Sequence, residues 1–364
     1  MSSRLGIAPI VLLLAGCLAP DAGAAQDPIA LARAGTVAIE QQRFGDALDA
    51  FTAAAALQPG DASLCFGAGV AAFMLGQDDL AQRRFECALA LKPDHLPAAM
   101  WLGDLHYRAG RLPEAISIYD TARLRSPNQD LEKQLALWRR EYELQSRFHQ
   151  VRTARFTALF ERAADEALAR DVVARLESAY WRIGRTLGVY PPAPVTVVLY
   201  TREQFADFTR LAEWSAAAYD GRIRVPLGET LERGDELDRV LSHELVHAVV
   251  VGMAGRSVPA WLSEGLATVL ASGGNGEAQP LLVSGAGRPG LSTLHRGFIG
   301  LSRPEAELAY ASAAHAVRRL LEHRGAATVV ALLRQLGRGA SFAFAFQQHI
   351  GMPYEEFAAL VARD

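Results

Sequence analysis

The sequence predicts an all-α repeat solenoid followed by an α+β domain. Three observations lead to this fold class: a spaced pattern of small, aromatic and proline residues recurs through the first third, short β-branched runs alternate with helical segments after residue 148, and a helix in the second part carries two histidines. The 364 residues are 50% hydrophobic and 21% charged, as is typical of ordered globular chains. A net charge of −3 does not favour capture of nucleic acid or anionic lipid.

Residues 1–25 are typical of an export signal. Arg4 precedes an apolar run, Gly6 to Leu14, which is too short to span a bilayer. The run ends in Leu14-Ala15-Gly16-Cys17, which is similar to a bacterial lipobox, so we expect a lipid anchor at Cys17. Ala22-Gly23-Ala24 is the alternative, an ordinary cleavage site. Both alternatives predict an exported protein in the periplasm or on the outer surface.

A 34-residue period organises residues 28–147, where Pro59, Pro93 and Pro127 follow one another at that interval. Glycine, alanine, aromatic and alanine positions recur with the same period: Gly35, Gly69, Gly103; Ala47, Ala81, Ala115; Phe51, Phe85, Tyr119; Ala54, Ala88, Ala122. The small residues allow two helices to approach closely, the aromatic residue fills the next interface, and the proline ends the second helix.

This pattern resembles the tetratricopeptide repeat at each of these positions in three consecutive units. Each helical hairpin leaves an apolar face for its neighbour to cover, and residues 130–147 are expected to form a capping helix. The resemblance implies a concave surface for a protein or peptide partner. The alternative is a spacer that holds the next domain away from the membrane.

Two cysteines lie within the repeats. An exported protein can oxidise Cys65 and Cys87 to a disulfide, but both also suit the role of small apolar side chains between helices. We expect the second of these roles. No Cys-x-x-Cys spacing indicates a thiolate metal site.

Residues 148–364 are expected to form the second domain. Residues 148–160 partly alternate and predict a strand, residues 165–188 a helix ended by Gly188, residues 194–200 a buried strand, and residues 201–208 a helix capped by Thr201. Residues 221–226 alternate and end in proline, which suits an edge strand.

The next predicted helix begins at Asp235, ends at Gly252 and contains His243-Glu244-Leu245-Val246-His247. Histidines four residues apart project from the same helix face, so that both imidazoles can bind one Zn²⁺ at about 2.0–2.1 Å. Glu244 is placed to reach a water molecule beside the metal and to act as general base. The alternative is an ordinary pair of helix histidines.

A third ligand is expected from the following helix, which starts near Pro259. Glu264 lies in an otherwise apolar segment, and an unpaired buried carboxylate is costly unless a cation compensates it. His243, His247 and Glu264 form a His₂Glu set with a fourth position open to water. A surface salt bridge is the alternative role for Glu264.

The segment from Phe148 onward resembles the peptidase MA-like gluzincins, whose signature H-E-x-x-H followed by W-L-x-E-G stands here at residues 243–247 and 261–265. The resemblance extends to residues 219–226, 309–312 and 332–357. It implies a zincin-like fold, zinc-dependent peptide hydrolysis, and alignment of an extended substrate along the strand before the motif helix. One departure is Thr268, since thermolysin-like enzymes place an acid there that orients a ligating histidine.

The same resemblance makes Tyr310 the candidate oxyanion donor, with His315 and His295 as less favoured candidates and core packing as the alternative for Tyr310. Residues 272–290 are rich in glycine and read as a loop beside the cleft, either a lid or a connection. The sequence thus predicts a zinc peptidase of the bacterial envelope, with repeats that recruit substrate or partner. An envelope scaffold with a non-catalytic zinc site is the alternative.

Overall fold

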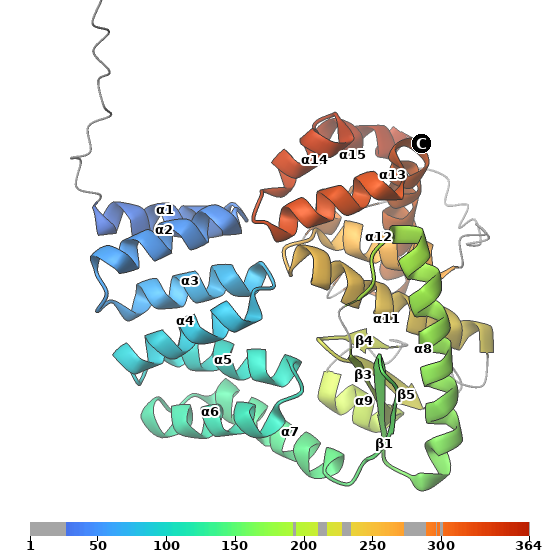
Figure 1. Cartoon of the computed structure of the whole chain (residues 1–364), viewed down its shortest axis with the longest axis horizontal. Helices are drawn as coiled ribbons and strands as arrows, with labels where there is room; N and C mark the ends of the chain where they lie inside the picture. The colour runs from blue at the N-terminus through green and yellow to red at the C-terminus, as the bar shows by residue number, and fades with distance from the viewer. Residues whose placement is uncertain are drawn as a thin grey trace, which may run out of the picture.

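The computed structural model describes residues 27–191, 194–209, 217–227, 234–272, 289–295, 297–298 and 301–363. It places a helical array beside a second region in which helices pack on a sheet (Figure 1). The export segment with Cys17 and most of the glycine-rich segment 272–290 lie outside the described residues. Within the described residues, no helix has the length and apolar character needed to cross a membrane.

Three helical hairpins build the array, and each unit contributes two helices: α1 (Pro28–Glu40) and α2 (Phe44–Leu57), α3 (Ala62–Met74) and α4 (Asp78–Leu91), α5 (Leu96–Arg108) and α6 (Leu112–Arg125). A Cβ atom on Gly69 would lie 2.6 Å from the Phe85 ring, and one on Gly103 would lie 2.3 Å from the Tyr119 ring. The recurring glycine is therefore required by the aromatic side chain that packs against it. Helix α7 (Gln129–Gln145) covers the last unit, as expected of the capping helix.

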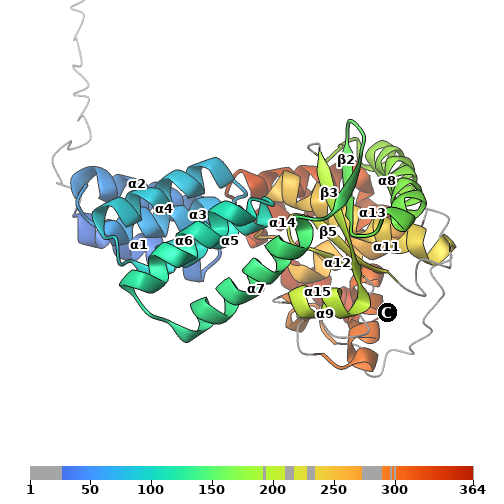
Figure 2. The same cartoon turned by 90° about the horizontal axis from the view of Figure 1, so that it is seen from below.

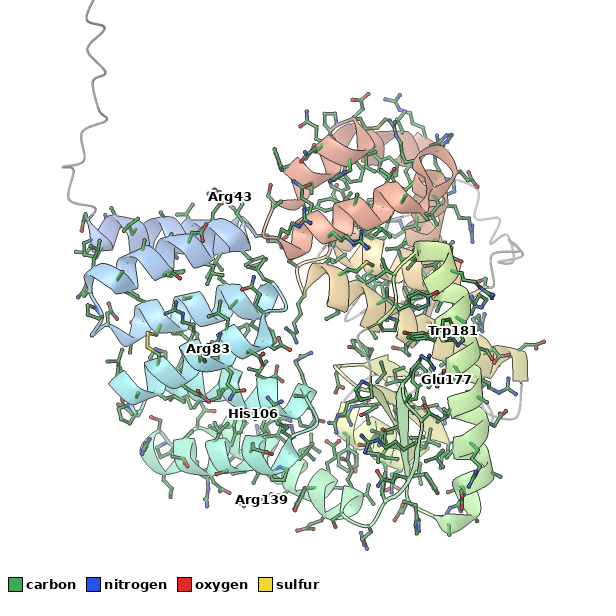
Figure 3. The ribbon with its side chains drawn as sticks, in the orientation of Figure 1. Arg43, Arg83, His106, Arg139, Glu177 and Trp181 are labelled. Carbon is green, nitrogen blue, oxygen red and sulfur yellow. A yellow bond between two sulfur atoms is a disulfide. The ribbon has the colours of Figure 1, made fainter. Side chains whose placement is uncertain are left out.

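The expectation for Cys65 and Cys87 was wrong. The two residues form a disulfide between α3 and α4, visible as the yellow bond in Figure 3. Helix packing brings their Cα atoms to 6.0 Å, which is within the range that a disulfide can bridge. A disulfide and apolar packing both place cysteines among apolar residues. The apolar sequence around Cys65 and Cys87 therefore did not distinguish the two roles.

The expected single strand over residues 148–160 is instead two antiparallel strands, β1 (His149–Arg152) and β2 (Phe156–Phe160). A turn separates them because the Thr153 hydroxyl accepts hydrogen bonds from the backbone N–H groups of Arg155 and Phe156.

The sheet has the order β1-β2-β3-β5-β4, with β3 at Val195–Thr201, β5 at Ile223–Leu227 and β4 at Ala218–Tyr219. Strand β3 pairs in parallel with both β2 and β5, whereas β4 pairs antiparallel with β5. The expected edge strand, β5, thus lies inside the sheet, and β4 lies at the edge. Pro226 of β5 does not interfere with β4, because β4 pairs only with Ile223 and Arg224.

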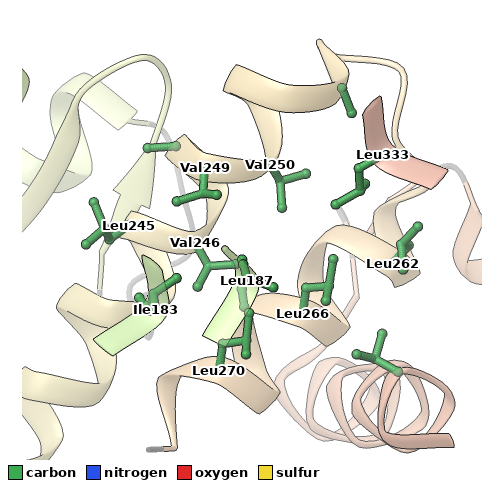
Figure 4. Packing of buried hydrophobic residues seen from close by; sticks show 14 of the residues in the cluster. Ile183, Leu187, Leu245, Val246, Val249, Val250, Leu262, Leu266, Leu270 and Leu333 are labelled. Carbon is green, nitrogen blue, oxygen red and sulfur yellow. The ribbon is translucent and has the colours of Figure 1, made fainter. Parts of the chain in front are cut away.

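Helices cover both faces of this sheet (Figures 1 and 2). One face packs against α8 (Glu166–Leu187), α11 (Gly234–Ala254), α12 (Ala260–Ala271) and α13 (Arg303–Gly337), which share one hydrophobic core. Figure 4 shows part of this core between α8, α11 and α12. The other face packs against α9 (Arg202–Thr209) and the end of α7. Helices α14 (Phe342–Ile350) and α15 (Tyr354–Arg363) complete the chain.

Two predicted helix ends can be compared with the structure. Gly188 ends α8 in the left-handed conformation, as expected. Gly252 does not end α11, which continues to Ala254 and is followed by Gly255 with a φ of 70°. A glycine inside a helix lowers its stability without ending it, whereas the left-handed turn requires a residue without a Cβ clash.

Candidate metal centre

Two helices bring the three expected ligands together. His243 and His247 lie on α11, Glu264 lies on α12, and one ligand atom from each lies within 4.8 Å of the others. Glu264 Oε2 is 3.2 Å from His243 Nε2 and 3.5 Å from His247 Nε2. A tetrahedral zinc site with bonds of about 2.0–2.2 Å has edges of about 3.3–3.6 Å. The donor atoms and their spacing therefore fit a zinc ion.

The three side chains are largely but not completely buried. His243, His247 and Glu264 retain 21%, 15% and 23% of their side-chain exposure. Structural zinc sites are closed by four protein ligands, whereas catalytic sites retain an open position. Three protein ligands with residual exposure match the second type.

Electrostatics couple Glu264 to the two histidines. Burial alone would raise the pKa of Glu264, but His247 and His243 outweigh it and hold that pKa far below its ordinary value. Burial likewise opposes the charged form of His247, yet the neighbouring Glu264 carboxylate raises the pKa of His247 to about 9. Without metal, a proton on His247 thus takes the place of the cation.

Glu244 is 7% exposed and lies between the two histidines in the sequence. Burial raises its pKa, and the nearby charges of Glu264 and Asp220 act in the same direction, while the two histidines oppose them. A raised pKa brings a carboxylate closer to the range in which it can both accept and return a proton. Glu244 accordingly has the environment of a general base.

Two residues that the sequence analysis missed support the ligands. Ser263 Oγ lies 3.0 Å from His247 Nδ1, so this hydroxyl occupies the orienting role left open by Thr268. Arg182 on α8 donates to Ser242 Oγ at 2.7 Å and to the Leu270 carbonyl at 2.5 Å, and thereby ties α11 to α12. Ser263 directly precedes Glu264, but neither residue lies in a pattern that marks its role.

Helix α12 is anchored by the other residues of its motif. Trp261 is fully buried and stacks on Tyr354 with ring centroids 5.9 Å apart. A Cβ on Gly265 would lie 2.4 Å from the Ala313 carbonyl oxygen of α13. The glycine therefore allows α13, which carries Tyr310, to pack closely behind the Glu264 position.

The structure places the three candidate oxyanion donors differently. The Tyr310 ring lies 6.2 Å from the His243 ring, and its pKa is raised by burial and by the charges of Glu264 and Glu244. His295 packs against the rings of Phe342 and Tyr354, in the aromatic cluster around Trp261. His315 follows Tyr310 on α13 by five residues, so it projects in a different direction from the helix. Tyr310 is therefore the candidate whose ring lies beside a ligand of the centre.

Comparisons with known proteins cover the helical array. Residues 32–81 and 79–130 match the model of the tetratricopeptide repeat. One similar solved structure is described as the first TPR of Spaghetti (RPAP3) bound to HSP90 peptide SRMEEVD; it is 21% identical, covers 32% of this chain and 97% of its own, and has a TM-score of 0.31. None of the curated proteins matches this chain. The family match confirms that the N-terminal helices form tetratricopeptide repeats, which are modules for protein interaction.

Proposed function

We propose that this protein is a zinc-dependent peptidase whose second region is a zincin-like α+β domain of the gluzincin type. The observation that carries the proposal is the convergence of His243, His247 and Glu264 from two helices, with their ligand atoms within 4.8 Å. The buried carboxylate of Glu244 beside this centre adds the base that peptide hydrolysis needs. A purely structural zinc site has no use for such a residue.

The residues divide the chemistry among them. Zinc held by His243, His247 and Glu264 would polarise the scissile carbonyl and acidify a water molecule. Glu244 then accepts a proton from that water and delivers it to the leaving amine. The Tyr310 hydroxyl, kept protonated by its raised pKa, donates a hydrogen bond to the developing oxyanion.

The proposed location is the bacterial cell envelope, with a lipid anchor at Cys17. The disulfide between Cys65 and Cys87 supports an oxidising compartment, because cytosolic thiols are normally kept reduced. In this setting the repeats would recruit a protein substrate or an envelope partner. A substrate is expected to be a protein or peptide, and nothing in the net charge of −3 favours nucleic acid.

The experiment is a comparison of wild-type protein with Glu244→Gln after zinc loading. Zinc content is measured by atomic absorption. Hydrolysis is measured separately, with casein and with a peptide library as substrates. The proposal expects about one zinc per chain in both proteins and hydrolysis in the wild type alone. Equal cleavage by the variant would refute the role of Glu244.

A scaffold with a non-catalytic metal site is the second candidate; the match of residues 32–81 and 79–130 to the tetratricopeptide repeat is compatible with both candidates. Here, binding through the repeats is the whole function. Zinc bound by the wild-type protein without turnover of any library peptide would select this candidate.

A further inference from the structure

One recurring position of the repeats contacts the second region. Phe73, Tyr107 and Glu141 lie 34 residues apart, near the C-terminal ends of α3, α5 and α7. All three residues contact an arginine of the second region. The guanidinium of Arg256 lies 4.1 Å from the centre of the Phe73 ring, and Arg224 contacts both Tyr107 and Glu141. The array therefore uses equivalent positions of successive units to bind its neighbour.

Arg224 on β5 is fully buried in this junction. Its guanidinium donates to Glu141 Oε1 at 2.7 Å, to the Tyr107 hydroxyl at 2.7 Å, to the Tyr200 hydroxyl at 2.9 Å and to Asp220 Oδ2 at 2.8 Å. The Tyr107 hydroxyl in turn donates to Glu141 Oε2 at 2.6 Å. A buried ion pair of this kind stabilises little by itself, but breaking it leaves an uncompensated charge. Its geometry is therefore strongly specified.

Arg256 makes a second connection to the array. Its guanidinium donates to both carboxylate oxygens of Asp78, at 2.6 and 2.9 Å, and to the Phe73 carbonyl at 2.8 Å. Its backbone N–H donates to the Met74 carbonyl at 2.7 Å. Gly255 lies so close to the turn after α3 that an added Cβ would meet the Leu75 carbonyl carbon at 2.5 Å.

Both arginines belong to elements that carry or contact the helix with the two histidines. Arg256 follows the last turn of α11, the helix that carries both histidines. Arg224 lies in the hairpin of β4 and β5, residues 218–227, and this hairpin contacts α11. The repeats thus hold the end of the metal-binding helix and the strand pair beside it.

We propose that Tyr107 and Glu141 of the repeats are positioning residues, which act through Arg224 to fix the 218–227 hairpin as the wall that aligns an extended peptide substrate. The substrate part of this inference rests on the proposed peptidase function; the fixing of the hairpin does not. Strand β4 forms the edge of the sheet among the described strands, and an edge is where an extended peptide adds by backbone hydrogen bonds. In this arrangement the repeats complete the cleft in addition to any partner that they bind.

The test uses the full-length, zinc-loaded protein with Tyr107→Phe and Glu141→Gln. Tyr107→Phe removes only the hydroxyl, which accepts a hydrogen bond from Arg224 and donates one to Glu141, so it preserves the packed ring and the direct Arg224–Glu141 pair. Tyr119→Phe is the matched control, because the Tyr119 hydroxyl donates a hydrogen bond within the array, to the Met100 carbonyl. Hydrogen exchange is followed in peptides from residues 218–227 and from α12, together with zinc affinity and the kinetics of peptide cleavage.

We expect exchange in residues 218–227 to accelerate about tenfold in both variants, with α12 unchanged and zinc affinity within about threefold of wild type. For cleavage, KM should rise while kcat changes little, since the reacting groups remain in place. Unchanged exchange in the hairpin of Tyr107→Phe, or the same acceleration in α12 or in Tyr119→Phe, would overturn the inference. If Glu141→Gln does not fold, Tyr107→Phe decides alone. If the wild type cleaves no peptide, the proposed function fails, while the exchange result still decides whether the repeats fix the hairpin.

Discussion

Glu264 Oε2 lies 3.2 Å from His243 Nε2, although 21 residues and a helix boundary separate the two side chains. This distance joins the two parts of the sequence motif in space, one on α11 and one on α12. Its maintenance depends on residues around the motif, including Arg182, Ser263 and Gly265.

Removing Glu264 should abolish tight zinc binding, whereas Ser263→Ala should weaken it by about 10–100-fold, as loss of a residue that orients a ligating histidine typically does. The effect is smaller for Ser263→Ala because Ser263 contacts Nδ1 of His247, whereas Nε2 is the nitrogen that would bind zinc. Competition with a chromogenic chelator measures both affinities. Ser272→Ala serves as the control, because the Ser272 hydroxyl caps a carbonyl at the end of α12. Equal affinities for Ser263→Ala and this control would contradict the orienting role.

The metal-free protein should lose stability as the pH rises from 6.5 to 9. In the folded state the pKa of His247 is raised from 6.5 to about 9, so its contribution is complete below pH 6.5 and is lost as the pH passes through 9. The pKa of Glu264 is lowered, so its contribution is present above its ordinary value of 4.5 and is lost only in acid. Calorimetry in EDTA should show that Tm falls between pH 6.5 and 9. In Glu264→Gln most of this pH dependence of Tm should be absent.

Zinc binding should release protons over the same interval, because a ligating histidine must be neutral. Apparent zinc affinity should therefore rise with pH between 6.5 and 9. Titration calorimetry in two buffers of different ionisation enthalpy measures the released protons. The absence of a buffer dependence at pH 7.5 would show that His247 is not protonated in the metal-free protein.

Tyr310→Phe should lower kcat by about 10²–10³ with little change in zinc affinity, if the hydroxyl donates to the oxyanion. The raised pKa of Tyr310 keeps this donor protonated at neutral pH, so the loss should not depend on pH between 6 and 9. Steady-state kinetics on a cleaved peptide measure the effect. A Tyr310→Phe variant with wild-type kcat would contradict the catalytic role and leave core packing as the role of Tyr310.

Gly265→Ala should destabilise the fold by about 1–3 kcal/mol, as overpacking of a well-packed core does. The added methyl group would lie 2.4 Å from a backbone oxygen of α13, and a backbone atom cannot move aside as a flexible side chain can. Urea unfolding measures the change. Gly60→Ala is the control, since its Cβ would meet no atom within 4 Å.

The repeats were the most predictable part of the fold because their spacing is periodic and each position has one physical role. The ligand helices were also predictable, since a four-residue interval between histidines fixes a shared face. The position of β5 inside the sheet was not, because its partner β4 has only two residues and no sequence pattern of its own. The disulfide was missed because buried cysteines look alike whether paired or free.

The junction between the repeats and the second region was missed for a different reason. Arg224 lies in an alternating strand, where a charged residue normally indicates a solvent-facing side. Its partners Glu141 and Tyr107 stand 83 and 117 residues earlier in the chain, so no local pattern connects them. Such contacts become visible only when two separately folded surfaces are placed together.

The proposed function requires that one zinc ion be bound by side chains from α11 and α12. Anomalous diffraction at the zinc absorption edge, from a crystal of the zinc-loaded protein, tests it most directly. We expect a single strong peak within about 2.0–2.2 Å of His243 Nε2, His247 Nε2 and a carboxylate oxygen of Glu264. A zinc-loaded crystal with no peak there, or with a peak bound by other residues, would contradict it.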